Sequence, residues 1–445
     1  MHGIREHATA LAEGRLTARA LVERCLDRIA AAAAGPVFLT VYAAQARAMA
    51  DAADALRRAG RAASPFAGIP ISLKDLFDVA GEPTPAASRA LADAPPAGAH
   101  ATVVARVLAA GFVPVGRTNM TEFAFSGLGI NPHHGTPLSP WQRERARVPG
   151  GSSSGAAVAV ADGMALGSLG TDTGGSCRVP AAFCGIVGYK PTARRVPLDG
   201  VLPLSPSLDS VGPLAGSVDC CAILDAVLAG AAPTRTAALP VRGLRLAVPE
   251  NVVLEEMDET AAAAFERALE RLAEAGALIL HCRFAALDEV AGVNALGGLA
   301  AAEAFAWHKD LLAAKAALYD PRVRARIERG ARQTAADYIG LRAARGRLVA
   351  SLDMATAPYD ALLMPTVPVV PPRIADLEED GEYNRVNMLV LRNTALGNFF
   401  DRCAISLPCH APGEAPVGLM LVGETMGDAR LFAVATAVER VLAQD

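Results

Sequence analysis

The most informative segment of this 445-residue chain reads Gly150-Gly151-Ser152-Ser153-Ser154-Gly155, then a connector of small residues, then Gly170-Thr171-Asp172-Thr173-Gly174-Gly175-Ser176-Cys177-Arg178-Val179-Pro180. It contains two Gly-Gly-Ser turns. Glycine has no Cβ, so several backbone N–H groups can face one point. A serine at the end of such a turn places its hydroxyl beside those donors, as a nucleophile lies next to an oxyanion hole. The segment therefore indicates an acyl-transfer site with Ser152 and Ser176 as its candidate serines.

A lysine precedes this segment at the end of a predicted strand. Between Gly68 and Lys74, apolar residues alternate at Ile69, Ile71 and Leu73, which is typical of a β-strand with one buried face. Burial disfavours the charged form of lysine and lowers its pKa from about 10.4. A neutral Lys74 amine can then act as the base that activates a serine hydroxyl.

These residues resemble the amidase signature family. Its pattern is a Gly/Ser-rich turn followed by Gly-x-Asp-x-Gly-Gly-Ser-x-Arg-x-Pro, with a strand-end lysine well before both. The resemblance implies a Ser-cisSer-Lys triad of Lys74, Ser152 and Ser176, in which Ser152 follows a cis peptide bond. Two residues depart from the pattern, since Cys177 replaces a usual aliphatic residue and Ser154 a frequent glycine. The likeness extends over three further segments, 116–124, 360–366 and 416–419, whereas residues 255–359 carry no matching motif.

The requirements of amide hydrolysis indicate how the surrounding residues act. A proton would pass from Ser176 to Ser152 and on to Lys74, and would return to the departing amine. Asp172 and Arg178 are expected to form an ion pair that braces the loop carrying Ser176, residues 170–180, which we call the nucleophile loop. Ser153 is expected to be a supporting residue. The scheme requires neither a metal nor a cofactor. Backbone N–H groups would form the oxyanion hole, and the candidates are those of Thr173, Gly174, Gly175 and Ser176.

Composition narrows the class of protein. Hydrophobic residues make up 52% of the chain and charged residues 20%, which allows a large core and excludes global disorder. The net charge of −4 argues against binding to nucleic acids. The eight cysteines contain no C-x-x-C pair, so reduced thiols are expected rather than a zinc site or a disulfide framework. Residues 1–7 lack the apolar core of a signal peptide, and Gly35-Pro36 breaks the uncharged run 29–46. We expect a cytoplasmic protein without a membrane span, and leave open whether it is a homodimer.

Predicted strands and helices alternate along the chain, which indicates an α/β protein. Strands are predicted at 68–74, 112–115, 166–169, 186–189, 244–248, 278–281, 362–364, 404–407 and 417–422. Helices are predicted at 17–29, 43–61, 101–110, 155–161, 181–184, 259–275, 300–354 (interrupted at Asp320-Pro321) and 428–443. The strand–helix–strand unit at 244–281 predicts parallel strands. Nothing divides the chain, and the family resemblance implies one domain over residues 1–445 with a mixed central β-sheet wrapped by helices.

The predicted activity is hydrolysis of a small carboxamide to a carboxylate and ammonia or an amine, through an acyl-Ser176 intermediate. Segments 127–134, 303–338 and 365–398 are expected to supply the pocket walls. Their residues mix apolar and polar types too evenly to identify the acyl group.

Three other functions fit parts of the sequence. Residues 151–155 also match the G-x-S-x-G elbow of α/β-hydrolases, which would make Ser153 the nucleophile with His281, His308 or His410 as base. That elbow must follow a strand, and here the charged, Pro-terminated segment 142–149 precedes it. The family resemblance also allows the amidase component of a tRNA-dependent amidotransferase. A binding module without activity is the third alternative, disfavoured because three polar triad residues near a core have no packing reason to persist.

Overall fold

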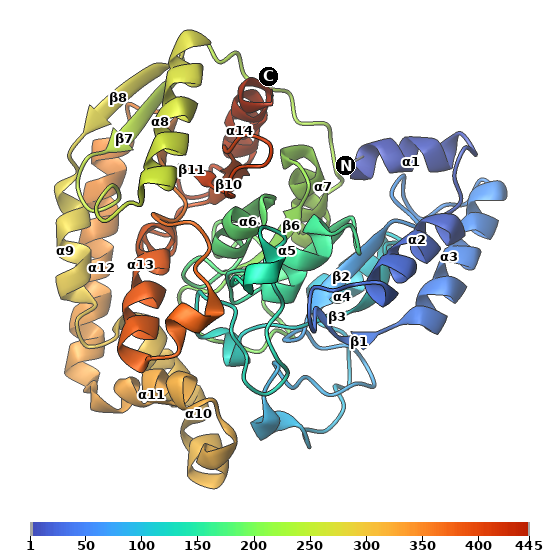
Figure 1. Ribbon diagram of the computed structural model, residues 1–445, viewed down its shortest axis with the longest axis horizontal. Helices are drawn as coiled ribbons and strands as arrows, with labels where there is room; N and C mark the ends of the chain where they lie inside the picture. Colours follow the sequence, from blue (N-terminus) through green and yellow to red (C-terminus); the bar gives the residue numbers. More distant parts are fainter. Residues whose placement is uncertain (1–2, 444–445) are drawn as a thin grey trace.

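An 11-stranded mixed β-sheet runs through the computed structural model, which describes residues 3–443 (Figure 1). Its strands are β1 (Phe38–Val41), β2 (Pro70–Lys74), β3 (Val113–Thr118), β4 (Gly167–Thr171), β5 (Val187–Lys190), β6 (Val211–Ala215), β7 (Arg245–Pro249), β8 (Leu278–Cys282), β9 (Ala361–Pro365), β10 (Ala404–Pro408) and β11 (Gly418–Val422). The α/β class and the mixed sheet within a single domain are confirmed. The predicted extent of that domain, 1–445, includes terminal residues that lie outside the described range.

The spatial order of the strands is β1-β3-β2-β4-β6-β5-β10-β11-β9-β7-β8. Two groups within the sheet are parallel: β2 pairs with β3 and β4, and β7 pairs with β8 and β9. The remaining pairs are antiparallel. The parallel pairing of β7 and β8 confirms the strand–helix–strand prediction for residues 244–281.

Fourteen α-helices surround the sheet within residues 3–443 (Figure 1). They are α1 (Ile4–Ala12), α2 (Ala18–Ala30), α3 (Ala43–Arg58), α4 (Thr102–Ala109), α5 (Ser154–Ala161), α6 (Arg178–Cys184), α7 (Val218–Ala229), α8 (Glu259–Glu274), α9 (Ala285–Val293), α10 (Gly298–Lys315), α11 (Pro321–Glu328), α12 (Ala335–Thr356), α13 (Asp380–Phe399) and α14 (Asp428–Leu442). Short 3-10 helices lie at Arg89–Leu91, Glu122–Ala124, Arg143–Arg145, Ala316–Leu318, Arg329–Arg332 and Ile374–Leu377.

The helix α5 is buried over almost its whole length and is the central element of the site region. Its sequence consists of small and β-branched residues, so it can pack closely against β2, β4 and α6. Gly155 shows how close this packing is, because a Cβ there would lie 2.3 Å from the carbonyl oxygen of Val37. The small residues after the first serine turn therefore form a core helix, as predicted for residues 155–161.

Several elements were not predicted. The strand β6 reads Val-Gly-Pro-Leu-Ala, in which glycine and proline are residues that strands usually avoid. The C-terminal half of α13 buries polar residues such as Asn393 and Thr394 beside apolar ones, so it shows no amphipathic stripe. The elements α1, β1, α7 and α9 were also missed. The predicted interruption at Asp320-Pro321 is confirmed, since Asp320 caps α11 and Pro321 is its first residue.

Residues 285–318 are apolar enough to resemble a membrane span by length and composition. In the structure they form two helices, because α9 ends at Val293 and α10 begins at Gly298. Gly297 has a φ of 106° at this break, a conformation that glycine adopts readily. The described chain therefore has no continuous helix across this segment.

Candidate active site

The site lies where two parallel strands end side by side. Lys74 is the last residue of β2 and Thr171 is the last residue of β4, and the register pairs Leu73 with Leu169. The Nζ atom of Lys74 lies 2.7 Å from the Oγ of Ser152 and 2.7 Å from the Oγ1 of Thr171. The structure therefore brings Lys74 and Ser152 into direct contact, as the sequence predicts, and adds Thr171 as a second hydroxyl partner.

Burial gives the Lys74 amine its unusual chemistry. The side chain is fully buried, and this loss of water lowers the pKa of Lys74 from 10.5 to about 7. Burial outweighs the attraction of three nearby acidic groups, Cys177, Asp172 and Asp209, which favour the charged form of Lys74. The Cys177 thiol is neutral because burial raises its pKa, and Asp172 is already paired with Arg178. A large fraction of Lys74 is therefore neutral near pH 7 and can accept a proton.

Asp75, the next residue in the chain, does not pair with Lys74. Its Oδ1 accepts a hydrogen bond from Arg117 Nε at 2.8 Å, and its Oδ2 accepts one from the Ala87 N–H. This follows from the alternation of side chains along an extended strand. The carboxylate beside Lys74 in sequence thus leaves the amine free to lose its charge.

Backbone hydrogen bonds join the two serine turns. The Gly151–Ser152 peptide bond is cis, as the family resemblance implies. The Thr121 N–H donates to the Ser152 carbonyl at 3.1 Å, and the Ser153 N–H donates to the Ser176 carbonyl at 3.3 Å. The Ser153 hydroxyl donates to the Thr171 carbonyl at 3.3 Å. Ser153 therefore links both turns to the end of β4, which is a supporting position.

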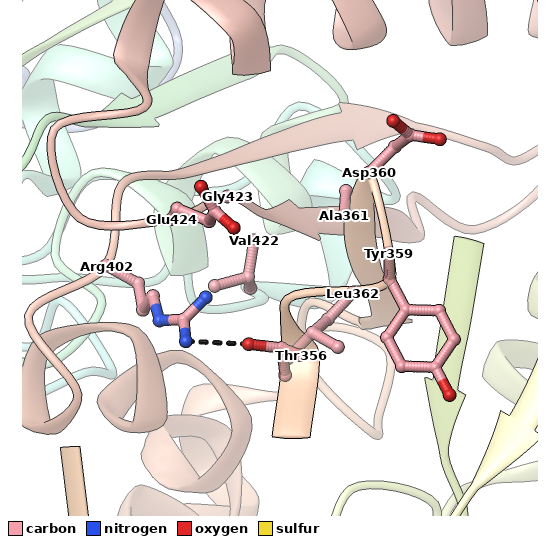
Figure 2. A pocket seen from close by; sticks show the side chains of 9 residues that line it. All are labelled: Thr356, Tyr359, Asp360, Ala361, Leu362, Arg402, Val422, Gly423 and Glu424. Atoms are coloured by element: carbon pink, nitrogen blue, oxygen red, sulfur yellow. Dashed lines mark hydrogen bonds between the residues drawn. The ribbon is translucent and has the colours of Figure 1, made fainter. Parts of the chain in front are cut away.

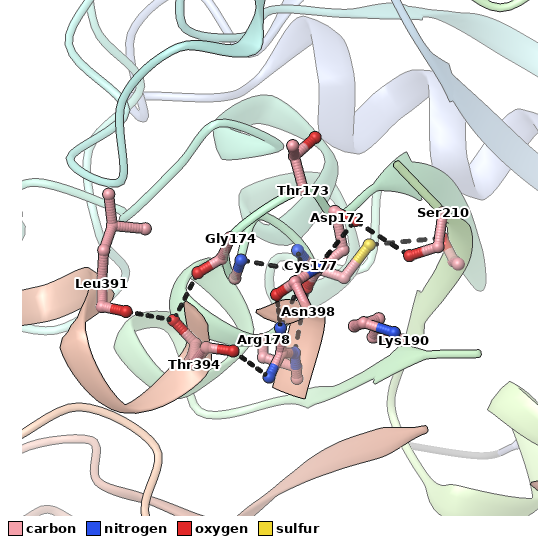
Figure 3. Close-up of polar contacts among 12 residues, drawn as sticks. Asp172, Thr173, Gly174, Cys177, Arg178, Lys190, Ser210, Leu391, Thr394 and Asn398 are labelled. Atoms are coloured by element: carbon pink, nitrogen blue, oxygen red, sulfur yellow. Dashed lines mark hydrogen bonds and ion pairs between the residues drawn. The ribbon is translucent and has the colours of Figure 1, made fainter. Parts of the chain in front are cut away.

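A buried ion pair organises the second turn (Figure 3). Arg178 Nη2 lies 2.8 Å from Asp172 Oδ1, and both side chains are completely buried. The carboxylate of Asp172 also accepts the N–H groups of Gly175 at 2.9 Å and Cys177 at 3.0 Å. Burial alone would raise the pKa of Asp172, but the charge and hydrogen bonds of Arg178 outweigh it and lower the pKa to about 2. Asp172 therefore stays ionised and holds the loop on both sides of Ser176.

The N–H groups around Ser176 fall into two sets. The Gly175 N–H donates to Asp172, so this predicted oxyanion donor is already engaged. Within residues 3–443, the N–H groups of Thr173, Gly174 and Ser176 have no hydrogen-bond acceptor. The hydroxyl of Ser176 is also without a partner in that range, and its side chain is only 4% exposed. The free donors and the free hydroxyl lie on one short loop, so an acyl group could meet both.

Two of the segments expected to line the pocket contact each other beside this loop. Leu391 of α13 packs against Gly127, where a Cβ would lie 2.8 Å from the leucine Cγ. The same side chain reaches Gly174, where a Cβ would lie 4.0 Å from its Cδ2. Segments 127–134 and 365–398 thus contribute an apolar surface next to the nucleophile loop.

Sequence reasoning missed Thr171, Thr394 and Asn398. The signal for Thr171 was present, because a polar residue at the end of a strand parallel to β2 should lie beside Lys74. Thr394 and Asn398 lie on α13, and each contacts the nucleophile loop more than two hundred residues away. Nothing local in the sequence marks such contacts.

Comparisons with known proteins support the family resemblance of the sequence. A family model described as amidase matches residues 20–432. The chain belongs to the amidase family. Membership of this family makes it a hydrolase that acts on carbon–nitrogen amide bonds.

Relatives of this amidase-family chain cover nearly its whole length. It is 40% identical over 444 residues to 2-amino-5-chloromuconic acid deaminase of Comamonas testosteroni, a match covering 99% of this chain and 96% of that protein. It is 37% identical to a component of the glutamyl-tRNA(Gln) amidotransferase of Chloroflexus aggregans, and this match covers 97% of this chain and 95% of that one. A crystal structure described as an amidase superposes with a TM-score of 0.90 at 33% identity, over 99% of both chains. One family thus contains relatives with different named activities.

The geometry does not support the hydrolase-elbow alternative. The Ser153 hydroxyl is buried and donates to a backbone carbonyl. His308 Nδ1 lies 2.9 Å from the Tyr319 hydroxyl, and His410 Nδ1 lies 3.2 Å from the Val417 N. His281 lies on β8, at the far end of the strand order. None of the three predicted histidines contacts Ser153.

A separate small pocket lies between the end of α12 and the ends of β9 and β11 (Figure 2). Arg402 lines it and donates to Thr356 Oγ1 at 2.8 Å and to Asp353 Oδ1 at 2.5 Å. The pocket shares no lining residue with the triad or the nucleophile loop. Those partners bind the Nη2 atom of Arg402, whereas its buried Nε has no hydrogen-bond partner within residues 3–443. The pocket is not part of the candidate site. Within residues 3–443, no group of three or more His, Cys, Asp or Glu side chains is placed to hold a metal ion.

The Asp172–Arg178 pair leads to a prediction about stability. Replacing Arg178 by methionine leaves a buried carboxylate without its charge partner, and such a loss typically costs ~3–5 kcal/mol. We therefore expect Arg178→Met to lower the free energy of unfolding by about that amount in urea denaturation followed by circular dichroism. Because the folded-state pKa of Asp172 is depressed, its contribution exists above the unfolded-state pKa and disappears as the pH falls towards 2.

The matched control is Arg347→Met. Arg347 pairs with Glu289 at 3.0 Å, but both side chains are about half exposed, and such surface pairs contribute ~0–1 kcal/mol. If Arg178→Met were no more destabilising than Arg347→Met, the buried pair would not be what holds the nucleophile loop.

Proposed function

We propose that the protein hydrolyses a small carboxamide to a carboxylate and ammonia or an amine, through an acyl-Ser176 intermediate formed by a Ser-cisSer-Lys triad. The observation that carries this proposal is the contact between Lys74 and Ser152 at 2.7 Å, in a site where the pKa of Lys74 is lowered to about 7. A buried neutral amine in contact with a serine hydroxyl is a competent base.

In the proposed acylation step, the oxygen of Ser176 attacks the substrate carbonyl carbon. Its proton moves to Ser152 as the Ser152 proton moves to Lys74. Ser176 and Ser152 make no hydrogen bond among residues 3–443, and substrate binding is the step expected to bring them together, since catalytic hydrogen bonds are often long in unliganded enzymes. The carbonyl oxygen becomes an oxyanion that the N–H groups of Thr173, Gly174 and Ser176 face.

Collapse of the tetrahedral intermediate breaks the carbon–nitrogen bond. The proton held by Lys74 returns through Ser152 to the departing nitrogen, which leaves as ammonia or an amine. A water molecule then repeats the sequence on the ester carbon and regenerates Ser176. Each half-reaction uses the proton that it releases, because the Ser176 proton leaves on the amine during acylation and a proton of water returns to Ser176 during deacylation. The proposed scheme includes no metal or cofactor.

The candidate oxyanion hole omits Gly175. Its N–H donates to Asp172, and turning it towards substrate would break a bond that holds the loop. The remaining three donors have no other acceptor within residues 3–443, and one such donor is typically worth ~3–4 kcal/mol in the transition state. The apolar side chain of Leu391, which would lie 4.0 Å from a Cβ at position 174, supports an acyl group with an apolar portion.

The test of this proposal is an assay of the purified chain alone, with ammonia release measured over a panel of aliphatic, aryl and ureido amides. Ser176→Ala is the control. Because deamination also releases ammonia, the panel should include an amino-dienoic acid of the kind named for the deaminase relative. Turnover by the chain alone, undiminished by EDTA and abolished in Ser176→Ala, is the expected result. Activity only with added partner proteins would instead favour the amidotransferase role.

The cellular setting is part of the same proposal. All eight cysteines are unpaired, which is compatible with a reducing compartment. We place the protein in the cytoplasm, acting on a small molecule rather than on nucleic acid or a membrane. Light scattering of the purified chain would distinguish the monomer from the homodimer.

A further inference from the structure

Helix α13 lies against the nucleophile loop and presents two polar side chains to it, Thr394 and Asn398 (Figure 3). They are one helical turn apart and buried. We propose that Thr394 is a positioning residue of the active site, which fixes the direction of the oxyanion-hole N–H groups by binding the Gly174 carbonyl. This inference rests on the proposed function, and names a residue that the triad scheme does not include.

The key contact joins Thr394 to one peptide unit of the loop. The Thr394 hydroxyl donates to the Gly174 carbonyl oxygen at 2.7 Å. The other end of the same peptide unit, the Gly175 N–H, donates to Asp172 Oδ1 at 2.9 Å. A peptide unit is planar and its carbonyl and N–H point in opposite directions. With both ends bound, this unit cannot rotate without breaking two hydrogen bonds, of which the one to Asp172 is buried and the one to Thr394 is partly buried.

The helix approaches the loop very closely at this point. A Cβ on Gly175 would lie 2.1 Å from Thr394 Oγ1. Gly175 also has a φ of 138°, which side chains rarely allow. Glycine at 175 therefore does two things: it permits the backbone conformation, and it leaves room for the threonine hydroxyl. The second Gly of the Gly-Gly-Ser turn is explained by Thr394 as much as by the turn.

Asn398 completes the attachment one turn farther along α13. Its Nδ2 donates to the Asp172 backbone carbonyl at 3.1 Å and to Asp172 Oδ1 at 3.0 Å. Its Oδ1 accepts from Arg178 Nη2 at 2.7 Å. Arg178 in turn donates through Nη1 to the Thr394 carbonyl at 2.8 Å. The loop is thus bound to α13 at its start, through Asn398, and next to the nucleophile, through Thr394.

The consequence for catalysis concerns the N–H groups on either side of the fixed peptide unit. The free donors of Gly174 and Ser176 take their directions from it. They are needed most when the carbonyl oxygen becomes an anion, and losing one oxyanion donor typically lowers kcat by ~10²–10³-fold. Thr394 does not hydrogen-bond to Lys74, Ser152 or Ser176. Removing its hydroxyl should therefore weaken the stabilisation of the transition state by these N–H groups without changing the proton relay.

The test is Thr394→Val, which replaces the hydroxyl by a methyl group of similar size. We expect kcat to fall by about 10–100-fold, a part of what a lost oxyanion donor costs, with KM nearly unchanged. The pH midpoint of kcat/KM should stay at the wild-type value, because the relay is intact. Thr394→Ser should restore most of the activity. The matched control is Thr436→Val, because Thr436 on α14 donates only to its own helix, at Phe432, and should keep wild-type kinetics.

A second readout uses a peptide-like aldehyde whose adduct with Ser176 carries the oxyanion. Its inhibition constant should rise in Thr394→Val by the same factor as kcat/KM falls, since both report the oxyanion donors. Circular dichroism checks the fold, and Thr394→Ala serves as the second hydroxyl-free variant if valine disturbs packing. An unchanged kcat in a folded variant, a shifted pH midpoint, or no rescue by serine would overturn the inference. An inactive wild-type chain, or an active Ser176→Ala, would instead overturn the proposed function.

Discussion

Replacing Ser176 by alanine is expected to lower kcat by at least ~10³-fold, as loss of a nucleophile does in other serine enzymes. The variant lacks the oxygen atom that bonds to the acyl group, and the Thr173 hydroxyl on the same loop is bound to Asp209. The fold should be retained, because the Ser176 hydroxyl has no hydrogen-bond partner within residues 3–443 that its removal would leave unsatisfied. Steady-state kinetics with the best amide from the panel, together with circular dichroism, measure both effects.

The matched control for this variant is Ser406→Ala. Ser406 on β10 is equally buried and lies 2.7 Å from Thr366 Oγ1, far from the triad in sequence and outside the proposed relay. It should keep most of the wild-type kcat. If Ser176→Ala retained more than a tenth of the activity while Ser153→Ala lost it, the nucleophile would be Ser153 and the assignment would be wrong.

Replacing Lys74 by arginine is expected to be nearly as damaging as replacing it by alanine, about 10²–10⁴-fold in kcat/KM, which is the contribution of a general base. Arginine keeps the positive charge, but its pKa exceeds ~12 and it cannot deprotonate at any working pH. If position 74 needed only a positive charge, Lys74→Arg would remain active. If it must accept a proton, Lys74→Arg would be inactive. Lys74→Met, which is neutral and buries well, should fail equally and separates the loss of the base from a loss of fold.

The wild-type pH profile follows from the same residue. Because burial lowers the pKa of Lys74 to about 7, the neutral, active form increases as the pH rises through 7. We expect kcat/KM to rise along a single ionisation with a midpoint near that value. The matched control is Lys190, also fully buried, with its pKa lowered to about 8 and its Nζ bound to the carbonyls of Pro191 and Arg402. Lys190→Met should leave the midpoint in place. A rate that is flat from pH 6 to 8, or a Lys74→Arg variant with more than a tenth of the activity, contradicts a lysine base.

Local signals in the sequence pointed to the candidate reactive groups. The alternation of Ile69, Ile71 and Leu73 predicted the strand that ends at Lys74, and the structure has that strand. The two Gly-Gly-Ser turns predicted loops with free N–H groups, and glycine is the residue that such loops require. These features depend on neighbouring residues, so they can be read without knowing the rest of the fold.

What the sequence could not show depends on contacts between distant segments. Thr171 becomes a partner of Lys74 only because β2 and β4 are neighbours in the sheet. Thr394 contacts a loop more than two hundred residues earlier, on a helix whose buried polar residues hide its periodicity. The occupied N–H of Gly175 was also unpredictable, because it depends on where the Asp172 carboxylate points. Residue types indicated the proposed acyl-transfer chemistry, whereas contacts between distant segments determine the geometry of the candidate site.

The most direct test of the central claim, that Ser176 carries the acyl group, is to trap the enzyme covalently. The purified chain is treated with a fluorophosphonate or a slowly hydrolysed ester, its intact mass is measured, and the modified peptide is mapped. We expect one adduct per chain, on Ser176, formed faster as the pH rises through 7, and no adduct in Ser176→Ala. An adduct on Ser153 or Ser152, or equal labelling of the Ser176→Ala variant, would contradict it.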